Sequence, residues 1–267
     1  MNIIISHDVD HINSFEHLSD LFLPKYFIRN TLELFAKSIS LSEFQKRIWH
    51  VLRNKFNNIE ALVAFDKEHS VKSTFFIAVN QALNLSYNSN QAKRWTDYIL
   101  NKGIPVGIHG IAYDTIDGIM EEKERFKELS GNYSFGIRMH YLRMNENTLA
   151  YLEQAGYRYD STVYSLKNPY KIGNLWEFPV NLMDTCAIYG DSNHQIKSLE
   201  QIKKETIQSI EKAEELKIQY FTIVTHDFYF SDSHKTWKDW YIWLIDYLQV
   251  RTYKFISFEN AVRELES

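Results

Sequence analysis

The sequence predicts an α/β protein built on a distorted (β/α) barrel of about seven parallel strands. Short apolar runs alternate along the chain with longer helical runs, as in a mostly parallel sheet covered by helices. Several of the apolar runs are hydrophobic on both faces, which is typical of buried parallel strands. The chain has only 4 prolines and 9 glycines and no segment of linker composition, so we expect all 267 residues to form one domain.

Eight short runs rich in β-branched and aromatic residues are the predicted strands. They are Asn2–Ser6, Ser73–Val79, Pro105–His109, Phe135–Met139, Tyr157–Asp160, Glu177–Asn181, Tyr220–Thr225 and Lys254–Ser257. Helical patterns lie between them over residues 57–69, 91–102, 115–130, 146–155, 198–216, 237–250 and 258–265. Gly103 and Gly156 stand where a helix commonly ends with a left-handed residue.

Residues 12–57 interrupt this alternation between the first and second strands. The segment is rich in Phe, Tyr and Leu and is predicted to be a helical insertion. It can act as a lid over a site, as a surface for homo-oligomer formation, or as added packing. Packing or an oligomer surface is the simpler interpretation.

Composition excludes several classes of function. The formal net charge of −4 and the dispersed Lys and Arg residues argue against a nucleic-acid partner. A single cysteine, Cys186, excludes an intramolecular disulfide and fits a reducing compartment. The N-terminal residues lack the pattern of a signal peptide, and no stretch approaches the ~20 apolar residues of a membrane span. We therefore expect a cytoplasmic protein.

Polar residues gather at the carboxyl ends of the predicted strands, which meet at one rim of a (β/α) barrel. The residues at these ends are His7, Asp8, Asp10, His11, His109, Arg138, His140, Asp160, His226 and Asp227. Four of the ten histidines lie within one residue of a predicted strand end, which scattered histidines would rarely do. Two acidic residues in these regions have simpler, structural interpretations. Asp160 can cap a turn, and Asp114 can lie just before a helix.

Asp8 and Asp10 form the most informative pair. Residues two apart on a strand point to the same side, so both carboxylates can face one site. Two adjacent carboxylates are costly unless a cation or a proton lies between them. The pair therefore indicates a metal site or acid–base chemistry, and oxygen and imidazole ligands suit Zn, Mn, Fe or Co.

These residues resemble the motifs of the polysaccharide deacetylase family, also called NodB-homology proteins or carbohydrate esterase family four. The resemblance covers nearly the whole chain outside the insertion. The matching segments are Ser6–Asp10, Ser73–Ile77, Gly107–Gly110, Gly136–Arg138, Gly156–Ser161, Trp176–Pro179 and Ile223–Asp227.

The resemblance implies a role for each site residue. Asp8 would be the catalytic base, Arg138 would orient it, and His226 would be the general acid. Asp10 and His109 would bind a divalent metal ion, Zn first among the candidates. The third ligand is open between His140 and Asp114, with His11 less favoured.

Three departures from the motifs of this family indicate that the chain resembles a divergent member. Val9 separates the two aspartates that are adjacent in the common first motif, and Tyr113 stands where the second motif usually has a histidine. The third motif lacks its prolines over residues 138–141.

The implied activity is hydrolysis of an amide, with removal of an N-acetyl group from an amino sugar or a surface-glycan precursor. Tyr113 favours an alternative, a metal-free amidase similar to allantoinases that acts on a non-sugar amide. A second alternative is an inactive carbohydrate-binding relative. The joint presence of a base, an acid and metal ligands argues against the inactive protein.

Overall fold

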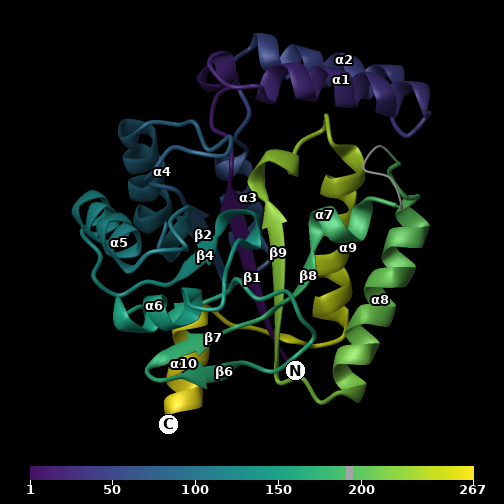
Figure 1. The fold of residues 1–267 in the computed structure, drawn as a ribbon. Coiled ribbons are helices and arrows are strands. Elements are labelled where there is room, and N and C mark those ends of the chain that lie inside the picture. The colour runs from purple at the N-terminus through teal and green to yellow at the C-terminus, as the bar shows by residue number, and fades with distance from the viewer. Residues whose placement is uncertain (191–194) are drawn as a thin grey trace.

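The computed structural model describes residues 1–190 and 195–267, and ten strands in this part of the chain form a single sheet (Figure 1). The strands are β1 (Asn2–Val9), β2 (Ser73–Ile77), β3 (Val106–Gly110), β4 (Ile137–Met139), β5 (Tyr159–Asp160), β6 (Tyr170–Ile172), β7 (Leu175–Glu177), β8 (Val180–Met183), β9 (Tyr220–His226) and β10 (Lys254–Phe255). Their order is β6-β7-β5-β4-β3-β2-β1-β9-β8, and β10 also pairs with β1.

The sheet is parallel except where β6 meets β7, and it curls into a half-barrel with helices around it, so the predicted fold class is confirmed (Figure 1). Tyr164, which follows β5, forms an isolated bridge with Val180 of β8. The two ends of the sheet therefore approach each other without a continuous ladder.

Seven of the helices match the helical patterns of the sequence. They are α3 (Ile59–Glu68), α4 (Ser89–Asn101), α5 (Ile116–Ser130), α6 (Thr148–Gln154), α8 (Leu199–Glu215), α9 (Lys235–Val250) and α10 (Phe258–Glu266). Side chains of Asn88, Thr115 and Ser198 accept backbone N–H bonds at the starts of α4, α5 and α8. Gly103 and Gly156 have φ of +76° and +74°, as the predicted helix ends require.

The insertion is helical, as predicted. It comprises a 3₁₀ turn, η1 (Ser14–Leu18), and the helices α1 (Phe22–Phe35) and α2 (Leu41–Leu52). Ser40 and Glu43 form a reciprocal capping box that begins α2. The two helices lie side by side above the carboxyl ends of the strands, at the top of Figure 1.

One predicted strand was wrong, because Glu177–Asn181 belongs to two strands at opposite ends of the sheet order. Pro179 has no N–H for a ladder and separates β7, which pairs with β5, from β8, which pairs with β9. A hairpin between β6 and β7 turns at Gly173, whose φ is +56°. The short helix α7 (Asp184–Ile188) then follows β8 and was also missed.

The pairing of β1 with its neighbouring strands brings several polar side chains together. β1 lies between β2 and β9, and nearly all of it is buried. Asp8 stands beside His226 of β9, and on the other side of the mouth His109 of β3 stands beside Arg138 of β4. Parallel pairing therefore brings these four side chains to one end of the sheet. Among the described residues, no helix has the length and apolar character needed to cross a membrane.

Replacing Gly136 with alanine should destabilise this sheet severely. A Cβ there would lie 2.0 Å from the Tyr159 ring, which is fully buried and stacked on Phe258. We expect the free energy of unfolding to fall by about 3 kcal/mol, at the upper end of overpacking costs. Urea unfolding followed by circular dichroism measures the change, and a loss below about 0.5 kcal/mol would contradict this packing.

Candidate metal and catalytic site

A pocket of about 680 Å³ opens at the carboxyl ends of β1, β3, β4 and β9. Polar residues from all four strands or the turns after them line it, namely Asp8, Asp10, His109, His140 and His226. Phe22 and Arg29 of α1 line the pocket too. The insertion therefore forms part of the pocket wall, beyond the packing or oligomer role that its composition suggested.

Asp10, His109 and His140 form a compact cluster within this pocket. The distance from Asp10 Oδ1 is 3.2 Å to His109 Nε2 and 3.4 Å to His140 Nδ1. The two imidazole nitrogens are 3.0 Å apart. The three atoms thus form a nearly equilateral triangle, and His140 occupies the position of the third candidate ligand.

Backbone carbonyls fix the orientation of both rings. His109 Nδ1 lies 3.1 Å from the Arg138 carbonyl oxygen, and His140 Nε2 lies 3.1 Å from the Leu83 carbonyl oxygen. A carbonyl only accepts, so each of these nitrogens carries the proton. The lone pairs of neutral His109 and His140 then point toward Asp10, in the arrangement that outer partners impose on metal-binding histidines.

This donor set fits a divalent metal ion. Three acceptor atoms converge, and Asp10 Oδ1 is buried without a hydrogen-bond partner. Ligands at the 2.0–2.1 Å typical of Zn–N bonds are about 3.3 Å apart in a tetrahedron, close to the distances found here. Burial lowers the pKa of His140, but Asp10 raises it more, so the triangle attracts a proton when no metal ion is bound.

The other two candidate ligands do not join the cluster. Asp114 is exposed in the loop after β3, which leaves the barrel mouth to reach α5. Glu122 holds the start of that loop by accepting N–H bonds from Ile111 and Ala112. His11 lines the pocket but is outside the cluster, and its Nδ1 lies 3.1 Å from His17 Nε2.

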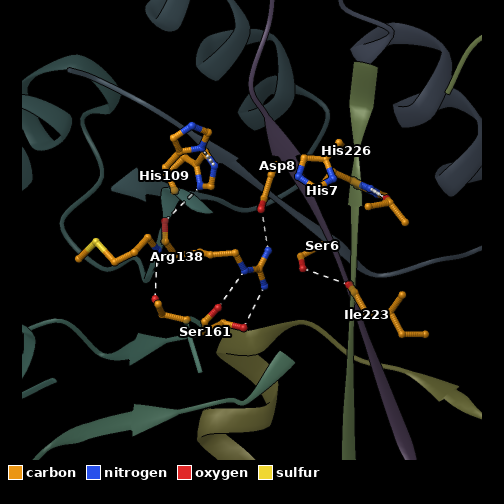
Figure 2. A network of polar contacts seen from close by, with 12 residues as sticks. Ser6, His7, Asp8, His109, Arg138, Ser161, Ile223 and His226 are labelled. Carbon is orange, nitrogen blue, oxygen red and sulfur yellow. Dashed lines mark hydrogen bonds and ion pairs between the residues drawn. The ribbon is translucent and has the colours of Figure 1, made fainter. Parts of the chain in front are cut away.

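Arg138 holds Asp8, the proposed base, in place (Figure 2). Its guanidinium donates to Asp8 Oδ1 at 2.8 Å and to the carbonyl and hydroxyl oxygens of Ser161, each at 2.9 Å. Burial raises the pKa of Asp8, but Arg138 and the nearby imidazoles outweigh it, and the pKa falls below its usual range. Asp8 is therefore ionised at neutral pH.

His226 is paired with Asp184, a residue that the sequence interpretation missed. Asp184 Oδ1 lies 2.8 Å from His226 Nδ1, and Asp184 Oδ2 accepts the His226 backbone N–H at 2.9 Å. Burial lowers the pKa of His226, but the Asp184 carboxylate raises it, to about 10 overall. Asp184 directly follows β8, so the correct division of 177–181 into two strands would have placed it at a strand end.

Three more polar residues at the strand ends have structural contacts. Asp227 accepts the Asn58 backbone N–H at 3.0 Å, and burial raises its pKa to about 8. Asp160 accepts from the Thr162 hydroxyl at 2.6 Å and so caps a turn. His7 is buried between Asp66 and Thr225, away from the pocket.

Glu122 should make stability depend on pH. Burial raises its pKa from 4.5 to about 7, so between these values the unfolded chain loses a proton that the folded chain keeps. Stability should therefore fall by roughly 3 kcal/mol as pH rises through this window. Glu122→Gln keeps an oxygen acceptor for the Ile111 and Ala112 amides but cannot ionise. Urea unfolding from pH 4 to pH 8 should show a flatter curve for the variant, and parallel curves would contradict the assignment.

The sequence matches no protein-family model and no curated protein. The folded chain, however, matches solved structures. A candidate polysaccharide deacetylase from Mycobacterium smegmatis superposes with a TM-score of 0.68 at 15% sequence identity, covering 99% of this chain and 90% of that chain. The fold is that of the polysaccharide deacetylases.

Two other structures share the polysaccharide deacetylase fold with this chain. An allantoinase matches with a TM-score of 0.60 at 13% identity, over 98% of this chain and 88% of its own. A pseudoenzyme of carbohydrate esterase family four from Bacillus anthracis matches with a TM-score of 0.53 at 9% identity, over 98% of this chain and 65% of its own. The fold is therefore compatible with several functions, and the choice among them depends on the site.

Proposed function

We propose that this protein is a divalent-metal-dependent hydrolase that removes an N-acetyl group from an amino sugar or a surface-glycan precursor. The convergence of Asp10 Oδ1, His109 Nε2 and His140 Nδ1, with both rings oriented by carbonyls, carries the proposal. Asp10, His109 and His140 would hold the ion, and two nitrogens with one carboxylate oxygen favour zinc. When bound, such an ion acts as a Lewis acid toward the scissile carbonyl and acidifies water.

Asp8 is the proposed general base of this reaction. Its carboxylate lines the pocket beside the metal cluster, and the ion pair with Arg138 keeps it ionised and oriented. It would accept the proton of the water that attacks the acetyl carbonyl carbon. Arg138 is fully buried and acts through Asp8 as a positioning residue.

His226 is the proposed general acid. Its Nδ1 faces Asp184, and its Nε2 lies 3.8 Å from Asp10 Oδ2, on the pocket side of the ring. Asp184 favours the protonated imidazole, which can give a proton from Nε2 to the departing amine as the C–N bond breaks. The aromatic side chains of Tyr141 and Tyr229 also line the pocket and offer flat faces to a sugar ring.

The residues of the pocket also help to judge the two alternative functions, a metal-free amidase and an inactive binding protein. Tyr113 favoured a metal-free amidase because a ligand was missing from the second motif, but His140 now supplies a third donor atom. The joint placement of Asp8, His226 and the metal cluster in one pocket argues against an inactive binding protein. The allantoinase fold match keeps a non-sugar amide as the second candidate substrate.

An acetate-release screen tests the proposal. The zinc-loaded protein would be incubated with free, nucleotide-linked and polymeric N-acetyl amino sugars, and with allantoin as the competing amide. We expect acetate from at least one N-acetyl sugar, abolished by a chelator and restored by added Zn²⁺. Turnover of allantoin alone, or acetate release that a chelator leaves unchanged, would contradict the proposal.

A further inference from the structure

Large hydrophobic side chains gather on the helical insertion. Of the eighteen that are exposed in residues 1–190 and 195–267, ten lie between positions 15 and 52. They are Phe15, Leu18, Leu21, Phe27, Ile28, Leu32, Phe35, Leu41, Trp49 and Leu52. Clusters of this kind mark interaction surfaces, whereas scattered exposed residues do not.

The α1–α2 hairpin, defined as residues 15–55, buries polar as well as apolar side chains and leaves many large apolar ones exposed. Its buried side contains Arg47, which donates to Glu33 at 2.5 Å and to Asn30 at 2.6 Å. At 100° per residue, Ile28 and Phe35 lie on the opposite side of α1 from Asn30 and Glu33, and Phe35 is 79% exposed. An ordinary surface helix exposes mainly polar residues, so the apolar outer face of this hairpin is suited to an apolar partner.

Charge identifies the kind of partner. The hairpin contains seven Lys and Arg residues and four Asp and Glu residues, a net charge of +3 in a chain whose total is −4. Its exposed charged residues are all cationic, namely Lys25, Lys37, Lys46, Arg53 and Lys55. A second copy would bring the same positive charge against this face, whereas anionic lipid headgroups would complement it.

Trp49 supports the same partner. The residue is 51% exposed, and the Arg53 guanidinium lies 4.7 Å from the centroid of its ring. Aromatic rings beside cationic side chains are typical of helices that lie in the interface of a bilayer.

We propose that the α1–α2 hairpin docks this protein on an anionic lipid surface, with its outer face at the boundary between headgroups and acyl chains. The inner side of α1 supplies Phe22 and Arg29 to the pocket, and the hairpin lies above the barrel mouth (Figure 1). Docking therefore brings the pocket beside the bilayer. If the proposed function holds, the substrate is an N-acetylated glycan precursor carried on a lipid.

Vesicle flotation tests the docking without any measurement of catalysis. The full chain would be mixed with vesicles of phosphatidylglycerol and phosphatidylcholine in equal parts, and with vesicles of phosphatidylcholine alone. We expect binding to the anionic vesicles that weakens as salt is raised. The triple variant Ile28→Ser, Leu32→Ser, Phe35→Ser should lower the partition coefficient at least about tenfold, because three apolar side chains no longer enter the interface.

Matched variants separate loss of the surface from loss of the fold. Leu216→Ser with Val250→Ser removes two exposed apolar side chains outside the hairpin and should leave vesicle binding unchanged. A second hairpin variant, Trp49→Ser with Leu52→Ser, should weaken binding like the triple variant. Circular dichroism of each variant should match that of the wild type.

Three results would overturn the docking proposal. The wild type would fail to float with either kind of vesicle, or the hairpin variants would bind as the wild type does. Alternatively, sedimentation velocity would show a wild-type dimer that the triple variant converts to monomer, which would make this face a contact between copies. Because none of these readouts uses acetate release, failure of the deacetylase proposal would leave the docking result interpretable.

Discussion

Replacing His226 with alanine should lower the turnover number for amide hydrolysis about 10²–10⁴-fold, the range expected for loss of a general acid. Without a proton from His226 Nε2, the departing nitrogen would leave as an amide anion. The Asp184 carboxylate, 2.8 Å from Nδ1, holds the imidazole in its protonated form in the wild type. Steady-state acetate release at saturating substrate measures the loss.

Asp227 provides the matched control for His226. It is the next residue in the chain, and burial raises its pKa to about 8, so it is mostly uncharged at neutral pH. Asp227→Asn keeps an oxygen acceptor for the Asn58 N–H and should change the turnover number by less than about threefold. Unchanged turnover in His226→Ala, or an equal loss in both variants, would remove His226 from the proposed mechanism.

Replacing Asp8 with asparagine should also lower the turnover number about 10²–10⁴-fold, because the amide cannot accept a proton from water. The variant keeps an oxygen that can accept from Arg138, so the local structure should survive. Metal content should remain that of the wild type, since Asp8 is outside the ligand cluster. This combination distinguishes a lost base from a lost metal ion.

Kinetics and metal analysis of Asp8→Asn are therefore needed together. Full metal content with greatly reduced acetate release is the expected result. A variant that retains at least half of the wild-type turnover would show that Asp8 is not the base. Loss of the ion in this variant would instead assign Asp8 to the metal site.

Periodicity and strand-end positions predicted much of the fold and the residues that gather in the pocket. Parallel strands end at a common edge, so Asp8, His109, Arg138 and His226 could be grouped before their distances were known. Asp114, a candidate ligand from the family resemblance, lies outside the cluster in the loop after β3, whose start is held by the buried Glu122. Hydrophobic periodicity contains little information about such contacts between a buried side chain and a loop backbone.

Two other contacts could not be predicted from the sequence because they join residues of different elements. The pairing of His226 with Asp184 joins two positions forty-two residues apart, and Pro179 concealed β8, which Asp184 directly follows. The insertion was predicted to be helical, but its inner polar contact between Arg47 and Glu33 could not be read from periodicity. That contact lies on the inner side of the two helices, together with the buried Tyr26 and Val51.

Metal analysis of purified variants tests most directly whether Asp10, His109 and His140 bind a metal ion. We expect about one divalent ion per wild-type chain, lost in Asp10→Ala, His109→Ala and His140→Ala and retained in Asp114→Ala. A wild type that remains metal-free after incubation with Zn²⁺, Co²⁺ or Mn²⁺, or a His140→Ala variant that retains its ion, would contradict this metal site.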